Sequence, residues 1–163
     1  MKRLVLLLLA IGVCCSVSAK VVLPRVLGSN MVLQQNTEIE LWGKADAGKR
    51  VTVEASWLKS KLKAEADSKV QTPKGSFEKY SITFSDGEEV CLENVMVGDV
   101  WVCAGQSNME MKMSGFDSQP VENSLSYIMN AGQMADHIRM FEEMNHRSYM
   151  KPMWDCVGGD WLV

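Results

Sequence analysis

In residues 20–95, apolar and polar side chains alternate in short runs. A period of two is the spacing that turns one face of a β-strand toward a core and the other toward solvent. The clearest runs are 37–42, 50–54 and 79–84, and turn-forming residues such as those at 46–48 separate them. Short strands at this spacing are typical of a small antiparallel β-sandwich. We therefore predict such a sandwich as the first folded domain.

The pattern changes after residue 95, where it indicates a strand, a helix and a second strand. Three successive apolar residues in 99–103 predict a buried strand of the parallel type, covered on both faces. Apolar residues at helical spacing predict a helix over 123–131, and 138–141 is predicted as a second short strand. An α/β three-layer domain begins with this order of elements, and we assign its incomplete start to residues 96–163.

The N-terminus has the pattern of a secretory signal peptide. Two basic residues precede the apolar run 4–13, which is too short to span a bilayer. Small residues at its end predict cleavage after Ala19, which makes 1–19 the signal peptide. We therefore expect a secreted or periplasmic protein. Cys14 offers a lipoprotein alternative, which is the minor interpretation because the residue before it, Val13, is not small.

Charge and composition argue against several partners. Two of the 17 Lys and Arg residues lie in the signal peptide, so the mature chain carries 15 basic and 20 acidic residues and a formal charge of −5. The chain has no basic block interleaved with aromatic residues, and we expect no nucleic-acid partner. It has no second apolar run long enough for a membrane span. Its Cys and His residues lack metal-ligand spacing, so no metal is expected.

Three cysteines remain after processing, namely Cys91, Cys103 and Cys156. An odd number does not indicate a disulfide framework. Cys91 and Cys103 fall in predicted strands, where we expect them to be small buried apolar residues. Two tryptophans of the β region, Trp42 and Trp57, could stack on sugar rings or pack in the core or rim, and packing is the favoured interpretation.

The candidate chemistry lies where the first α/β strand would end. Gly105 would allow a tight turn, and Ser107 and Asn108 stand where helix N-caps are preferred. A serine at this point would lie beside free backbone N–H groups, at the strand end where open α/β sheets bind ligands. The positive end of a helix there would favour the anion formed in acyl transfer. A Ser-Asn pair at such a position is, however, most often only a cap.

The run Gly105-Gln106-Ser107-Asn108-Met109, followed by Glu110-Met111, resembles the first block of the sialate O-acetylesterase family. These proteins are secreted carbohydrate esterases within the SGNH (GDSL-like) hydrolases. The resemblance extends over nearly all of the chain from Val22 to Trp161. Its further motifs, in order, are 23–27, 30–35, 42–43 with 47–48, 85–87, 92–95, 115–116 and 119–121.

This resemblance implies serine-dependent hydrolysis of an acetyl ester on a sugar hydroxyl, through an acyl-enzyme and without a metal or organic cofactor. Ser107 would be the nucleophile, and its N–H a donor to the oxyanion. Gly105 would support the turn, while Gln106 and Asn108 would shape the pocket. The substrate would be an acetylated sugar or glycan, either a sialic acid or an acetylated plant or bacterial polysaccharide.

The sequence departs from the family in its catalytic partners. The family's base is a histidine near the C-terminus, held by an aspartate shortly before it, and that block is absent from these residues. His137 follows Asp136 directly, but adjacent side chains on a strand point to opposite faces, which disfavours a local dyad. His146 lies in a polar segment and is no better placed, and Glu142-Glu143 is expected to be a solvated pair.

Two further segments carry expectations. The family usually has a Gly-x-Trp strand opening where this chain continues with 68–71, so strand pairing there is in doubt. Met109, Met111 and Met113 could line a substrate mouth, although core filling around the start of the helix is the favoured interpretation.

The function predicted from the sequence is therefore that of an O-acetylesterase of carbohydrates, inactive as this fragment alone. Two alternatives stay open. The chain could be a secreted, non-catalytic β-sandwich module that binds a sugar or a partner. It could also be a truncated pseudoenzyme.

Overall fold

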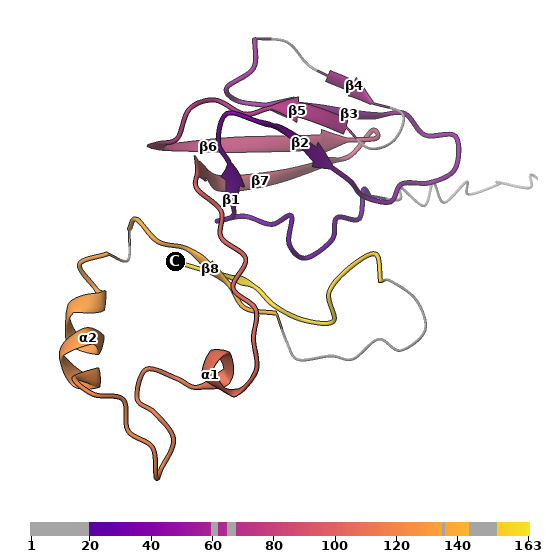
Figure 1. The fold of residues 1–163 in the computed structure, drawn as a ribbon. Coiled ribbons are helices and arrows are strands. Elements are labelled where there is room, and N and C mark those ends of the chain that lie inside the picture. The colour runs from indigo at the N-terminus through magenta and orange to yellow at the C-terminus, as the bar shows by residue number, and fades with distance from the viewer. Residues whose placement is uncertain (1–19, 60–61, 65–67, 135, 144–152) are drawn as a thin grey trace, which may run out of the picture.

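The computed structural model describes residues 20–59, 62–64, 68–134, 136–143 and 153–163 (Figure 1). The predicted signal peptide, its cleavage site and His146 lie outside these residues. The elements in chain order are β1 (Val32–Gln34), β2 (Glu38–Leu41), β3 (Val51–Ala55), β4 (Leu62–Ala64), β5 (Ser68–Gln71), β6 (Ser76–Ser85), β7 (Glu89–Gly98), α1 (Ser107–Glu110), α2 (Ser124–Ala131), β8 (Met140–Phe141) and β9 (Trp161–Leu162).

The first seven strands form two sheets. Five of them lie in the order β1-β7-β6-β3-β4, and β2 pairs with β5 in a smaller sheet. All pairs are antiparallel except β1 and β7, which run parallel with Val32 opposite Met96. The expectation of a purely antiparallel sandwich is therefore wrong in this respect. Alternation reports which face of a strand is buried, but it does not report the direction of the neighbouring strand.

The two sheets share one hydrophobic core. Leu41 and Val70 of the small sheet belong to the same buried cluster as Val53, Ile82 and Val95 of the large one. Each of these side chains comes from the inward face of its strand, as the alternation predicted. Full burial of such an aliphatic side chain stabilises the fold by roughly 1.5–3 kcal/mol. This core makes residues 20–98 the sheet-dominated part of the molecule.

Strand β5 forms where the pairing was in doubt. It pairs with β2 over four residues, from Glu38 opposite Gln71 to Leu41 opposite Ser68. The buried side chain of Val70 fixes this register, because a slip by one residue would turn it to solvent. On the outer face, Lys69 Nζ lies 3.2 Å from a carboxylate oxygen of Glu38. The missing family motif has therefore not prevented a regular strand.

Strand β7 continues through Gly98, past the predicted domain boundary between residues 95 and 96. Its last residues complete the parallel pairing with β1. The sheet consequently extends three residues into the segment assigned to the second domain. The division into two domains stays a prediction.

The region after β7 differs from the expected strand–helix–strand unit. Residues 99–105 are not a strand, and the side chains of Trp101 and Val102 are 84% and 91% exposed. No strand of the described residues pairs with this segment, and its apolar side chains are exposed. The predicted parallel strand is therefore absent here because a strand needs a partner for its hydrogen bonds.

The predicted helix and second strand are present in shorter form. Helix α2 follows Asn123 as expected, but its apolar residues, including Leu125 and Ile128, are exposed. Strand β8 has only two residues and pairs antiparallel with β9 at the end of the chain. Figure 1 shows α1 and α2 on an open loop that leaves the sheet after β7 and returns to it at β8.

Cys91 and Cys103 are exposed, contrary to the prediction that they would be buried. Cys91 lies on the outer face of β7 and Cys103 in the exposed segment after it, and both are free, as is Cys156. Of the two tryptophans, Trp57 packs against the core in an edge-to-face contact with Tyr80, as favoured. Within the described residues, no helix has the length and apolar character needed to cross a bilayer.

Candidate active site

Ser107 is the first residue of helix α1, which has a single turn. The N-cap is Gln106, one residue earlier than the expected cap at Ser107 or Asn108, and it makes no side-chain hydrogen bond. The carbonyl of Gln106 accepts hydrogen bonds from the N–H groups of Met109 (2.9 Å) and Glu110 (3.2 Å). The N–H groups at the start of a helix have no acceptor within that helix. The N–H of Ser107, at the start of α1, therefore has no acceptor within the helix.

At Gly105 a side chain would be crowded by Met109, whereas the backbone dihedrals do not call for a glycine. Its φ is outside the left-handed region, contrary to the expectation of a conformation that a Cβ would resist. A Cβ at this position would lie 2.6 Å from Cγ of Met109, well inside van der Waals contact. The turn therefore places the side chain of Met109 over Gly105. A larger residue would force that methionine to move.

The surroundings of Ser107 are open to solvent. The side chains of Gln106, Ser107 and Asn108 are all exposed, so they do not form a pocket among themselves. In the described part of the chain, no histidine or carboxylate hydrogen-bonds the Ser107 hydroxyl. A serine hydroxyl needs a base to become an effective nucleophile at neutral pH. The arrangement thus presents the hydroxyl and a donor without the base.

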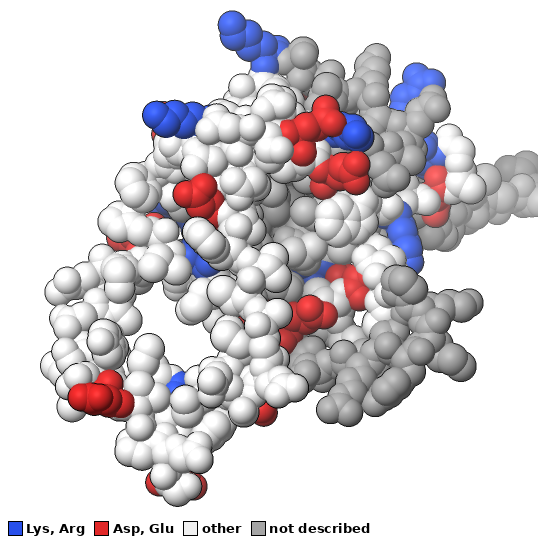
Figure 2. Space-filling model, in the orientation of Figure 1, with Lys and Arg blue, Asp and Glu red and all other residues white. Residues whose placement is uncertain are grey.

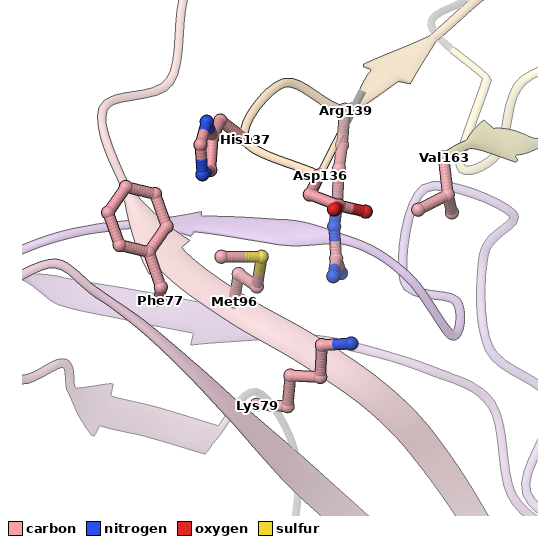
Figure 3. Close-up of a pocket in the computed structure, with 7 residues that line it drawn as sticks. All are labelled: Phe77, Lys79, Met96, Asp136, His137, Arg139 and Val163. Carbon is pink, nitrogen blue, oxygen red and sulfur yellow. The ribbon is translucent and has the colours of Figure 1, made fainter. Parts of the chain in front are cut away.

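His137 lines a pocket that does not include Ser107. Its ring lies 4.6 Å from that of Phe77, centroid to centroid, with a tilt of 46°. The pocket has a volume of about 270 Å³, and its lining consists of Phe77, Lys79, Met96, Asp136, His137, Arg139 and Val163. Figure 3 shows His137 against Phe77, while the carboxylate of Asp136 points toward the other side of the pocket. Because Ser107 does not line this pocket, the two do not form a Ser-His pair.

The methionines around α1 do not fill a core. Met109 and Met113 are both about half exposed, so the favoured interpretation of core filling is wrong for them. Glu142 and Glu143 are exposed, as expected. On the face shown in Figure 2, basic and acidic residues are interspersed over the sheet region, and the described loop region is mostly uncharged. The exposed neighbours of Ser107 include the polar Gln106 and Asn108 and the charged Glu110, so the surface around it is of mixed character.

Two groups with shifted pKa values lie away from Ser107. Burial, with a hydrogen bond from its Sγ to Asp155, raises the pKa of the Cys156 thiol. A raised pKa makes the thiolate scarcer at neutral pH, which disfavours Cys156 as a nucleophile. Burial also lowers the pKa of Arg139. Among the described residues, no group of three His, Cys, Asp or Glu side chains is placed to hold a metal ion.

The fold is similar to part of a solved enzyme. The crystal structure of a carbohydrate acetylesterase from Xanthomonas citri matches 87% of this chain with a TM-score of 0.70 and 25% sequence identity. The chain shares its fold with a carbohydrate acetylesterase. It spans about a third of that protein, since the match covers 32% of the esterase chain. No protein-family model and no curated protein matches this chain.

Proposed function

We propose that this chain supplies the β-sheet domain and the nucleophile-bearing segment of a secreted carbohydrate O-acetylesterase of the sialate O-acetylesterase type. The observation that carries the proposal is the structural match to a carbohydrate acetylesterase over 87% of the chain. The run Gly105–Met109, which resembles the family's nucleophile block, lies at the start of a helix in this structure. The substrate would be an acetylated sugar, and the second domain would be completed outside these residues.

The reaction assigned to Ser107 is acyl transfer through two steps. The Ser107 oxygen attacks the acetyl carbonyl, and its proton passes to a histidine that the family provides in a later block. The bond from the acetyl carbon to the sugar oxygen breaks, and the sugar leaves with that proton. Water then releases acetate and restores the serine. Backbone donors, among them the Ser107 N–H, would stabilise the oxyanion in both steps.

The same proposal implies that residues 20–163 alone do not turn over an ester. Among the described residues no base is hydrogen-bonded to Ser107, and His137 lies against Phe77. Oxyanion donors from later blocks are also missing, and one lost donor alone costs about 10²–10³ in rate. The open loop also leaves the serine in water, where electrostatic stabilisation is weak.

A second candidate function is a non-catalytic module that binds sugar. The supporting observation is a pair of half-exposed indoles, Trp42 and Trp154, on the sheet region. The indole N–H of Trp42 donates to the carbonyl of Trp154 (3.4 Å), and the Lys44 ammonium lies 3.8 Å from the centre of the Trp154 ring. Exposed aromatic rings with a nearby polar group are suited to stack on a sugar face.

A graft separates these candidates. Residues 20–163 would replace the matching third of the Xanthomonas citri esterase, and hydrolysis of an aryl acetate would be compared with that of the Ser107→Ala graft. We expect activity that Ser107→Ala reduces by several orders of magnitude, because loss of a triad nucleophile can cost on the order of a millionfold in turnover. A graft that folds by circular dichroism and retains activity within tenfold after Ser107→Ala would contradict the proposal.

A glycan-binding measurement on the chain itself tests the alternative. Trp42→Ala should abolish binding of an acetylated oligosaccharide if the module binds sugar through these indoles, whereas Ser107→Ala should not change it.

Export is tested by sequencing the N-terminus of the secreted protein. We expect Lys20 as its first residue, and a retained Met1 would exclude cleavage.

A further inference from the structure

Two asparagines join the turn before β1 to strand β7. Asn30 and Asn94 both have left-handed backbone conformations, with φ of 69° and 57°. Asn94 Nδ2 donates to Asn30 Oδ1 at 2.7 Å, and the N–H of Asn30 donates to the carbonyl of Glu93 at 3.0 Å. Asparagine adopts this conformation at less cost than most residues with a Cβ. The two residues therefore form a bridged pair on the sheet.

Asn94 lies in a β-bulge. Tyr80 is opposite Val95 and Ile82 is opposite Leu92, so β7 has one more residue than β6 between these pairs. An extra residue at a bulge is left out of the regular ladder. The carbonyl of Asn94 is thereby made available to a donor from outside the sheet.

Arg139 provides that donor. Its Nη1 donates to the carbonyl of Asn30 at 3.0 Å and to the carbonyl of Asn94, and its Nη2 donates to Asn94 Oδ1 at 2.9 Å. These contacts join positions 109 and 45 residues apart in the chain. Hydrogen bonds from a charged donor contribute about twice as much as neutral ones. We call Asn30, Asn94 and Arg139 together the arginine clasp.

The clasp lies at one end of the loop that carries Ser107. At the other end, Val100 N donates to Gln34 Oε1 and Gln35 Nε2 donates to Asp99 Oδ1, both at 2.9 Å. Between these anchors, no hydrogen bond joins the described residues of 101–134 to the sheet region. The placement of α1 relative to the sheet is therefore set mainly at the two ends of the loop.

We propose that Arg139 is a positioning residue, which fixes the returning end of the Ser107 loop to the bulge of β7. The clasp itself is independent of the proposed function; only the statement that it positions a nucleophile rests on it. Arg139 lies where the chain returns to the β7 bulge, one residue before β8, which pairs with β9 in a separate two-stranded sheet. Without it, two backbone carbonyls and the amide oxygen of Asn94 would lose their donors, and the loop would be held at one end only.

The test is hydrogen exchange followed by NMR on the full chain. Arg139→Met keeps an unbranched apolar stem and removes all the donors, and Arg139→Lys retains the charge. The probes are the amides of β8 and β9 and the indole N–H of Trp161, which donates to the carbonyl of Val26 at 2.9 Å. We expect Arg139→Met to raise exchange at these probes by roughly 10- to 100-fold, as the loss of one charged hydrogen bond implies. Arg139→Lys should restore part of the protection.

A pair of asparagine variants gives the matched control. Asn94→Gly keeps the left-handed backbone and removes the side chain from the clasp. It should also raise exchange at the β8 and β9 probes, by a smaller factor than Arg139→Met. Asn36→Gly makes the same change at another left-handed asparagine, with φ of 52°, outside the clasp. It should leave the β8 and β9 probes at the parent rates. Because Gly is tolerated at positive φ, neither variant strains the backbone.

Two outcomes would overturn the proposal. Exchange at the β8 and β9 probes that stays within twofold in Arg139→Met would exclude the clasp as an anchor. Equal increases at these probes and at the core amides of β6 and β7 would assign Arg139 a general role in stability instead. The positioning claim has its own readout, the heteronuclear NOE of the amides from Ser107 to Glu110, which should fall in Arg139→Met. An unchanged NOE would remove that claim, and no measurement here depends on esterase activity.

Discussion

Residues 20–98 bury their apolar side chains in one core, whereas the loop of residues 99–138 leaves most of its apolar side chains in solvent. Ile82 in β6 and Ile128 in α2 are the same residue type in elements that sequence patterns predict equally well. Ile82 is fully buried and Ile128 is 47% exposed. Every strand of the sheet region has a pairing partner within that region, whether the partner follows a short turn, as β7 follows β6, or lies far along the chain, as β7 does from β1. The loop lacks such partners among the described residues, so its apolar pattern indicates what can be buried but not what buries it.

The largest expected difference between the two regions is a core truncation. Ile82→Ala should lower the free energy of unfolding by about 2–5 kcal/mol, because it removes buried methyl groups and leaves a cavity. Ile128→Ala should change it by less than about 0.5 kcal/mol, as an exposed substitution does. Urea unfolding followed by tryptophan fluorescence measures both. Equal effects would show that α2 is packed and would break the comparison.

A smaller difference is expected between two hydroxyls. The buried Thr72 Oγ1 donates to the carbonyl of Gln34 at 2.7 Å and accepts from the N–H of Thr37 at 3.1 Å. Thr72→Val should cost about 1–3 kcal/mol, because buried polar groups lose their partner. Ser107→Ala should be neutral within about 0.5 kcal/mol. A destabilising Ser107→Ala in the same unfolding assay would give that serine a structural role.

The exposed apolar segment after β7 should promote dye binding and self-association without contributing to the stability of the fold. Trp101→Ser should reduce the fluorescence of a bound hydrophobic dye and the tendency to self-associate, because exposed apolar patches drive both. It should move the melting temperature by no more than about 2 °C, as expected for a surface change in a chain of this size. Lys112→Ser in the same loop is the control. A strong loss of stability in Trp101→Ser would show that this side chain is packed.

The smallest effect is expected from the outer face of the small sheet. The hydrogen bond and charge of Glu38 raise the pKa of Lys69, so the pair stabilises the fold below the unfolded pKa of about 10.5 and loses this contribution as the pH rises through the higher folded pKa. The pair is exposed and therefore weak. Glu38→Gln should narrow the difference in stability between about pH 8 and pH 11.5, as measured by urea unfolding. An unchanged difference would show that solvent screens the pair completely.

The local pattern of apolar and polar residues located several strands of the sheet region. The runs at 37–42, 50–54 and 79–84 correspond to β2, β3 and β6, since half-buried strands impose a period of two. The helix over 123–131 was also found, as α2. The pattern failed at 99–103, where apolar residues predicted a strand that has no partner among the described residues, and at Cys91, where strand membership did not reveal which face of the strand the side chain is on. At Gly105 the structure shows the closeness of Met109 and not the left-handed φ that the sequence led us to expect.

The candidate site was visible in the sequence only as a motif. The Gly105–Met109 run drew attention to Ser107. The argument against an Asp136–His137 dyad assumed a strand, whereas the structure places both residues in a turn before β8. Nothing in the local pattern indicated that His137 would stack on Phe77, 60 residues earlier in the chain. Nor did it mark Arg139, which sits in a short apolar run that reads as an ordinary strand.

The sequence by itself determined where the strands β2, β3 and β6 and the helix α2 lie, and where the Gly105–Met109 motif stands. These properties depend on residues close together in the chain. The tertiary structure decided the parallel pairing of β1 with β7, the bulge at Asn94 and the clasp that Arg139 makes with it. The parallel pairing and the clasp join residues more than 40 positions apart, and their contact depends on how the whole chain closes rather than on any local preference.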